Sequence, residues 1–288
     1  GARVWIQIGT LTFQPGEIAK IALAIFFAGY LVSHRESLSM VGRRFLGMRL
    51  PRGRDLGPLI VVWLLAMGVI VSQRDLGTGL LIFGLFLVML YTATSRVSWI
   101  VLGVSMIVVG ALAANQFLSY VHDRFQNWYD AFNPDIYNAD GGSYQVVQGL
   151  FGLAHGGLFG TGLGQGMPYV TPVSQSDYII SSLGEEIGLI GIFAVLSLYI
   201  LFVSRGLRIG FAGNDDFSTL LAVGLSFVIA LQCFLVIGGV TRLLPMTGLT
   251  TPFMAAGGSS LIANWMIVGL LLRLSDTNRR QAQLVVSS

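Results

Sequence analysis

The sequence has few charged residues, one lysine and one cysteine. Asp, Glu, Lys and Arg together make up 11% of its 288 residues, whereas a soluble globular domain typically has about 25%, so a water-soluble fold is excluded. The single cysteine, Cys233, cannot form a disulfide within the chain, and no Cys/His spacing indicates a zinc site. We therefore expect Cys233 to be a small side chain in an apolar core.

Long hydrophobic runs occupy most of the sequence. Apolar residues make up 54% of it, and the mean hydropathy is +0.74. A helix needs about 20 consecutive apolar residues to cross a bilayer. We therefore predict an all-α, polytopic membrane helix bundle with seven spans, at about 15–33, 58–73, 77–94, 98–118, 178–204, 217–240 and 254–274.

The basic residues are distributed unevenly between the two faces that seven alternating spans create. Most of them fall on one face, namely Arg35, Arg43, Arg44, Arg49, Arg52, Arg54, Arg96, Arg205, Arg208, Arg273, Arg279 and Arg280. The opposite face holds Arg3, Arg74, Arg124 and Arg242, and Lys20 lies inside the first span. The positive-inside rule predicts that the arginine-rich face is cytoplasmic. Residues 119–177 then form a large extracellular loop.

The extracellular loop contains a glycine-rich stretch at 149–166, GLFGLAHGGLFGTGLGQG. It lacks the GxxxxGK[ST] lysine of a P-loop and follows no βα unit, so phosphate cradling is not indicated. Glycines that permit tight turns and close helix packing explain it better. We expect His155 within it to be a surface residue, and residues 1–288 to form a single membrane domain.

Two groups of ionisable residues lie at the extracellular ends of the first and third spans. Glu17 and Lys20 are spaced i, i+3 and therefore share one helix face. They form either a neutralised structural pair or a cation and an acid that line a cavity. Asp75, in QRDLGTG, is either the N-cap of the next helix or a site residue.

Three further acids and one arginine surround the last three spans. Asp177 stands three residues after Ser174, which suits a capping arrangement, but it also lies at the membrane surface, where a reactive carboxylate would meet a lipid headgroup. Glu185 and Glu186 are adjacent and so about 100° apart on a helix, which lets one of them face a narrow cavity. Arg242 either binds a lipid phosphate or extends to the interface.

Five motifs, read together, resemble the SEDS family of bacterial cell-wall polymerases, the RodA and FtsW group. They occur in family order over essentially the whole chain: GARVWIQIG with FQPGEIAKI, QRDLGTG, YQVVQGLFGLAHGGLFGTGLGQG, SQSDYIISSLGEEIGLIG and LPMTGLTTPFMAAGGSSLIAN. The QRDLGTG and LTTPF wording is more similar to the actinobacterial RodA branch. The chain departs from the family in QPGE for QPSE, in SDY for TDF, and in Ala255 and Ala256 for a serine and a tyrosine.

The resemblance implies a ten-span fold of which these seven spans are the last seven, so that three spans would precede residue 1. It implies a peptidoglycan glycosyltransferase that polymerises lipid II at the outer face of the bacterial cytoplasmic membrane, for elongation or for division. A class B penicillin-binding protein, a transpeptidase, is the implied partner, with membrane lipid but no nucleic acid. We expect the 288-residue chain alone to be inactive.

The resemblance also assigns roles to the candidate residues. Asp177 matches the family's essential aspartate, which makes it the general base. We expect Lys20, Glu17, Arg242, Asp75, Glu185 and Glu186 to contribute to substrate binding, with Lys20 and Arg242 at the pyrophosphate. No ligand spacing indicates a metal or another cofactor, although the acids leave a divalent cation open. Two other functions also remain open: a lipid II flippase, and a scaffold that recruits cell-wall enzymes.

Overall fold

The computed structural model describes residues 6–8, 11–39, 44–45, 48–49, 56–213 and 215–287. Arg3, Arg43, Arg52 and Arg54, which the charge count used, lie outside these residues. The regular secondary structure of the described part is helical, apart from two short antiparallel hairpins. These are β1 (Ile6–Ile8) with β2 (Leu11–Phe13) and β3 (Arg44–Phe45) with β4 (Met48–Arg49).

Within the described ranges, six helices are long and apolar enough to cross a membrane. They are α1 (Pro15–Ser39), α3 (Leu76–Thr94), α4 (Val97–Phe117), α8 (Ile179–Phe211), α9 (Asp216–Val240) and α10 (Gly258–Ser287). The remaining predicted span, at about 58–73, corresponds to α2 (Gly57–Gln73), an apolar helix of 17 residues. At 1.5 Å per residue it is about 26 Å long, slightly less than the hydrocarbon core. The prediction of a polytopic helix bundle is confirmed.

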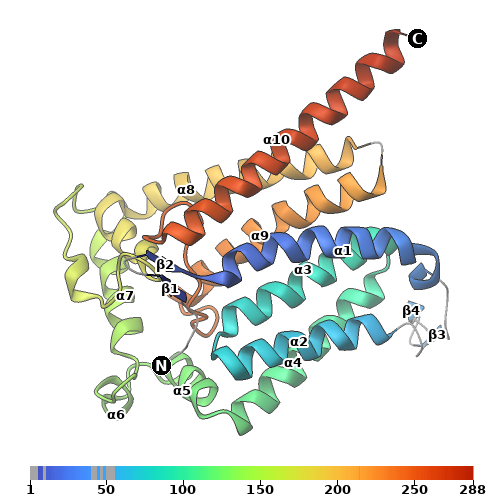
Figure 1. The fold of residues 1–288 in the computed structure, drawn as a ribbon. Coiled ribbons are helices and arrows are strands. Elements are labelled where there is room, and N and C mark those ends of the chain that lie inside the picture. The colour runs from blue at the N-terminus through green and yellow to red at the C-terminus, as the bar shows by residue number, and fades with distance from the viewer. Residues whose placement is uncertain are drawn as a thin grey trace.

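Helices α9 and α3 form the centre of the bundle. Most of the side chains in both are buried, and α9 packs against α8, α3, α1 and α10 (Figure 1). Cys233 lies on α9 and is buried, as expected. By contrast, α8 leaves a row of large apolar side chains exposed, including Leu189, Phe193 and Leu198, which is typical of a helix face that contacts lipid.

The segment between α4 and α8 gathers at one end of the bundle. It contains α5 (Ser119–Tyr129), α6 (Pro134–Tyr137), α7 (Tyr144–Gly156) and the short 3-10 helix η2 (Pro168–Val170). Figure 1 shows α5, α6 and α7 at the end where β1 and β2 lie, whereas β3 and β4 lie at the opposite end. One face of the bundle therefore carries a large folded cap.

The loop between α9 and α10 enters the bundle from the same end. Gln232 in α9 donates from Nε2 to the Thr250 carbonyl oxygen at 2.8 Å, and the Tyr199 hydroxyl of α8 donates to the Pro252 carbonyl oxygen. The Ala256 N–H donates to the Gln175 carbonyl oxygen at 2.8 Å. Irregular backbone at membrane depth needs such partners because lipid supplies none, and these hydrogen bonds supply them to the loop.

Helix α8 is broken at Gly188, where φ is 69° and ψ is −176°. The span predicted at about 178–204 is confirmed as Ile179–Phe211, which is long and apolar enough to cross a membrane, and the break at Gly188 is a further feature that was not predicted. The glycine-rich segment supplies the missing hydrogen bonds: Leu189 and Ile190 donate to the carbonyl oxygens of Gly157 and Leu158 at 2.9 and 3.2 Å. In the other direction, residues 161 and 162 donate to the carbonyl oxygens of residues 185 and 186 at 2.9 and 3.0 Å.

This backbone-to-backbone contact explains the glycines. A Cβ on Gly160 would lie 2.1 Å from the Glu186 carbonyl oxygen and 2.7 Å from the Gly188 nitrogen, and Gly160 has a left-handed φ of 82°. No side chain fits such a space. The prediction that these glycines serve close packing is confirmed.

We expect Gly160→Ala to destabilise the fold more than Gly164→Ala. Gly164 also has a left-handed φ, 73°, but a Cβ there would meet nothing within 4 Å, so alanine costs about 1–2 kcal/mol for the backbone alone. At Gly160 steric overlap adds about 1–3 kcal/mol. Thermal unfolding midpoints of the two variants in the same detergent measure the difference. Equal midpoints would show that the segment does not pack tightly on α8.

Candidate functional site

Asp177 lies between η2 and the first residue of α8. The N-cap of α8 is Tyr178, and no side chain caps this helix. The capping interpretation of Ser174 and Asp177 is therefore wrong. Instead, the Ser176 hydroxyl donates to Asp177 Oδ1 at 3.1 Å. The carboxylate is left to face a pocket, which is what a reactive group requires.

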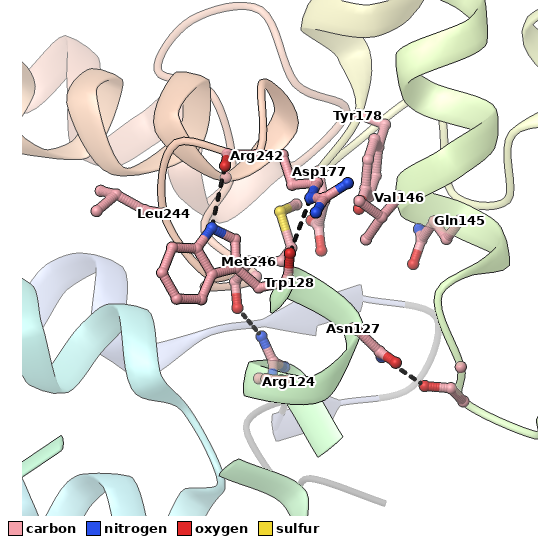
Figure 2. A pocket seen from close by; sticks show the side chains of 14 residues that line it. Arg124, Asn127, Trp128, Gln145, Val146, Asp177, Tyr178, Arg242, Leu244 and Met246 are labelled. Atoms are coloured by element: carbon pink, nitrogen blue, oxygen red, sulfur yellow. Dashed lines mark hydrogen bonds between the residues drawn. The ribbon is translucent and has the colours of Figure 1, made fainter. Parts of the chain in front are cut away.

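The pocket has a volume of about 180 Å³ and lies between α5, α7, the start of α8 and the loop after α9 (Figure 2). Its charged residues are Asp177, Arg124 and Arg242. The other residues that line it are Asn127, Trp128, Gly141, Gly142, Gln145, Val146, Tyr178, Gly239, Leu244, Met246 and Gly248. The pocket thus brings together Asp177 and Arg242, which are 65 positions apart in the sequence.

Arg124 is the cation that faces Asp177. It extends from α5 and donates from Nη1 to the Met246 carbonyl oxygen at 2.6 Å. A Cβ built on Gly248 would lie 3.6 Å from Arg124 Nη2 and 3.9 Å from Asp177 Oδ2. The guanidinium and the carboxylate thus both border the space that a side chain at position 248 would fill. In the sequence, Arg124 is only one charge on this face, because nothing local marks a single arginine in an amphipathic helix as a site residue.

Burial raises the pKa of Asp177 to about 6. The loss of water around the carboxylate is the largest cause, and the Ser176 hydrogen bond and the Arg124 charge act in the opposite direction but more weakly. The charge of Asp75 adds a small further rise. At neutral pH the carboxylate is deprotonated, yet it is a stronger base than an exposed aspartate, and this combination suits proton abstraction.

Arg242 lines the pocket and also holds α5 in place. It donates from Nε and Nη2 to the carbonyl oxygens of Trp128 and Tyr129, at 2.8 and 3.1 Å, where α5 ends. Trp128 Nε1 donates back to the Arg242 carbonyl oxygen at 3.0 Å, and the guanidinium lies 5.3 Å from the Phe132 ring centroid. An arginine at a helix C-terminus stabilises its unpaired carbonyls. Figure 2 shows the pair formed by Arg242 and Trp128 beside Asp177.

Glu17 and Lys20 form a buried ion pair outside this pocket. Lys20 Nζ lies 2.6 Å from Glu17 Oε2, and both side chains are almost fully buried. Lys20 Nζ also donates to Gln232 Oε1 at 2.9 Å. Because Gln232 binds the Thr250 carbonyl oxygen as well, the pair is connected to the loop that carries Gly248. Of the two alternatives that the sequence left open, the geometry matches the neutralised structural pair. The pair acts on the site only through the loop that carries Gly248.

Asp75 is the N-cap of α3, which is one of the two roles that the sequence predicted for it. It accepts from the Thr78 N–H at 2.9 Å and from the Thr78 hydroxyl at 2.6 Å. Among the described residues that line the pocket, Asp75 is absent, so it affects Asp177 only through its charge.

The structure distinguishes Glu185 from Glu186. Glu185 is buried, and its carboxylate accepts from His155 Nδ1 at 3.0 Å and from the Met167 N–H at 3.1 Å. Glu186 is half-buried, and its carbonyl oxygen binds Gly162. Neither lines the pocket. Glu185 instead ties His155 and Met167, on either side of residues 156–166, to α8. His155 keeps more than half of its side chain exposed, as predicted.

The described part of the chain contains no group of three His, Cys, Asp or Glu side chains that could hold a metal ion. The site is therefore built from one carboxylate of raised pKa and two arginines, and it lies at one end of a membrane helix bundle. This combination defines a polytopic membrane protein with a polar pocket at one membrane face.

The family model described as "Cell cycle protein" (FtsW/RodA/SpoVE) matches residues 1–280. The chain belongs to this family, which confirms the resemblance drawn from the five motifs.

Curated relatives agree with this placement. The chain is 48% identical over 280 residues to the peptidoglycan glycosyltransferase RodA of Mycobacterium tuberculosis, covering 97% of this chain and 59% of that protein. It is 34% identical to the probable peptidoglycan glycosyltransferase FtsW of Geobacter sp., covering 98% and 73%. The higher identity to the mycobacterial protein confirms the predicted similarity to the actinobacterial RodA branch. The chain spans 59% of the length of the mycobacterial relatives that it matches.

Solved structures share the fold. A chain of a peptidoglycan synthase complex, described as coordinating polymerization and crosslinking, matches with a TM-score of 0.72 and 24% identity, over 96% of this chain and 74% of that one. The rod shape determining protein RodA of Thermus thermophilus matches with a TM-score of 0.59 and 22% identity, over 96% and 70%.

We expect Lys20→Met to destabilise the fold strongly, because it leaves Glu17 buried without its cation. Breaking a buried pair in this way costs about 3–5 kcal/mol. The double variant Glu17→Gln/Lys20→Met should recover most of the loss. Asp216→Asn is the matched control: it breaks the Arg35–Asp216 pair, whose side chains are about half exposed, and should cost less than about 1 kcal/mol. Thermal unfolding in detergent ranks the three. A Lys20→Met variant as stable as the parent would contradict the structural role.

Proposed function

We propose that this chain is the catalytic membrane domain of a peptidoglycan glycosyltransferase, which polymerises lipid II into glycan strands at the outer face of the bacterial cytoplasmic membrane. The observation that carries the proposal is Asp177, a carboxylate with a pKa of about 6 that faces Arg124 across a polar pocket at a membrane face. The mycobacterial relative's description as a peptidoglycan glycosyltransferase supports it. The low number of arginines on this face supports its extracellular orientation.

In the proposed reaction Asp177 is the general base. The acceptor is the 4-hydroxyl of an N-acetylglucosamine, which is too weakly nucleophilic at neutral pH to react without losing its proton. Asp177 takes that proton as the hydroxyl oxygen bonds to the donor's anomeric carbon. The bond from that carbon to the pyrophosphate oxygen breaks, and undecaprenyl pyrophosphate leaves with the electron pair. The transfer inverts the configuration at the anomeric carbon.

The arginines stabilise the charge that develops on the leaving group. Fixed cations in a pocket partly screened from water stabilise such charge more than solvent does. We assign this role to Arg124 first, because it faces the carboxylate, and to Arg242 as a second contact at the pocket wall. The other candidate residues support the site indirectly. The Glu17–Lys20 pair is connected to the loop after α9, Asp75 caps α3, and Glu185 holds the glycine-rich segment, with Glu186 next to it in the chain.

Two features fit a lipid substrate and a protein partner. An apolar cavity of about 510 Å³ lies between α2, α3, α4 and α9, and it suits a prenyl chain. Farther along α8, away from residues 189–193, the exposed apolar side chains Ile200 and Leu201 suit the membrane helix of a class B penicillin-binding protein. The similarity in fold to a chain of a peptidoglycan synthase complex supports such a partner.

We expect Asp177→Asn to lower the rate of glycan polymerisation by about 10²–10⁴-fold, the usual contribution of a general base. The assay incubates the full-length protein and its partner with lipid II in detergent and resolves the glycan ladder on a gel. Asp140→Asn, an exposed acid on the same cap, is the control and should retain full activity. Ladders that form equally well with Asp177→Asn would refute the mechanism. Transport of labelled lipid II across vesicles without any ladder would favour a flippase.

We also expect the pH dependence of the rate to report the Asp177 pKa. The rate should fall as the pH drops through about 6, because the protonated carboxyl cannot accept the hydroxyl proton. Ser176→Ala removes a hydrogen bond that lowers this pKa, so it should move the acidic limb of kcat/KM to higher pH. Ser174→Ala is the matched control and should leave the limb unchanged. A limb near pH 4 in the parent would show that burial does not raise the pKa of the group that titrates.

A further inference from the structure

The cap between α4 and α8 divides into a charged half and an uncharged half. Residues 119–140 contain four aspartates and Arg124, whereas residues 141–176 contain no Asp, Glu, Lys or Arg. A surface segment of 36 residues without one charge is unusual when the chain meets water, because such surfaces are typically rich in charge.

The uncharged half exposes large apolar side chains over a short distance. Phe159, Leu163 and Leu158 are 80%, 77% and 58% exposed. All three lie in 157–163, the segment that is hydrogen-bonded to the break in α8. Exposed apolar patches of this kind mark surfaces that contact lipid or another protein.

The position of the segment on α8 indicates lipid. Leu158 is bonded to Ile190, which is itself exposed together with its neighbours Leu189 and Phe193 on the membrane-spanning helix. Ile190 precedes Arg205 by 15 residues, or about 22 Å along a helix. The hydrocarbon core is about 30 Å thick. With Arg205 at or beyond the opposite boundary, Ile190 and the segment beside it lie within the apolar layer on the Asp177 face.

We propose that residues 157–163 form a membrane anchor, which inserts Leu158, Phe159 and Leu163 among the acyl chains of the leaflet on the Asp177 face. The occupant of this patch is membrane lipid, since the patch continues the lipid-facing surface of α8 without an intervening charge. Its backbone can enter the apolar layer because α8 pairs with four of its polar groups, the carbonyl oxygens of residues 157 and 158 and the N–H groups of residues 161 and 162. The proposal does not depend on the glycosyltransferase activity.

The anchor sets the height of the site in the membrane. Glu185 ties Met167 and His155, on either side of the anchor, to α8, and the chain reaches Asp177 ten residues after Met167. A cap held in this way keeps the pocket at the level of the lipid headgroups.

Fluorescence quenching tests the anchor directly. In the full-length protein, native cysteines including the buried Cys233 are replaced by alanine, and Phe159→Cys is labelled with an environment-sensitive dye and reconstituted in vesicles. Phe193→Cys on the lipid face of α8 and Asp140→Cys on the charged half of the cap serve as controls. Quenchers are lipids with a nitroxide near the glycerol end or near the middle of the acyl chain, and aqueous iodide.

We expect the label at position 159 to lose most of its fluorescence to nitroxide lipids, more to the shallow one than to the deep one, and little to iodide. The label at 140 should show the reverse. Quenching at 159 by iodide as strong as at 140 would overturn the proposal, as would protection from both quenchers, which would mean that protein covers the patch. Leu163→Cys provides a second site, and it should behave as 159 does if the segment inserts as a unit.

Discussion

The structure depends on one constraint, that backbone polar groups inside a lipid layer must find partners within the protein. Helix α8 opens at Gly188, and the segment 157–162 closes the opening with four backbone hydrogen bonds. The same constraint governs the loop after α9, whose carbonyl oxygens accept hydrogen bonds from Gln232 and Tyr199. The loop after α9 lines the pocket, and the chain that follows the segment 157–162 reaches Asp177. Non-helical backbone, held by hydrogen bonds within the protein, therefore shapes the site.

Around that backbone framework, charges are either neutralised or directed into the pocket. Lys20 and Glu17 neutralise each other in the bundle, and Arg242 binds the end of α5. Asp177 has neither an ion-pair partner within bonding distance nor a cap to form in the described structure, and its raised pKa follows from that burial. The contrast between satisfied charges and one carboxylate of raised pKa is typical of a functional site.

Much of this was predictable from the sequence, and the part that was not has a common cause. Hydropathy located the membrane helices, because a membrane-spanning segment is a continuous apolar run in the sequence. The resemblance to the family's motifs singled out Asp177, whose spacing from Ser174 suggested only a helix cap. Arg124, the break at Gly188 and the burial of Lys20 were not predicted. Each depends on contacts between residues distant in sequence, such as Arg124 with Met246 and Lys20 with Gln232. Glu185 and Glu186 could not be separated for the same reason, since only the position of the glycine-rich segment distinguishes them.

Gly248 has a φ of 78°, and the space where its side chain would stand is bordered by the Arg124 guanidinium and the Asp177 carboxylate. A ligand that enters this space displaces no side chain of residue 248, and the guanidinium that it meets is already held by the Met246 carbonyl oxygen. Ordering a side chain on binding costs about 0.5–1.5 kcal/mol, and the missing side chain at residue 248 avoids that entropic loss. The pocket is therefore preorganised at this point, so the energy of binding remains available for orienting the reacting groups.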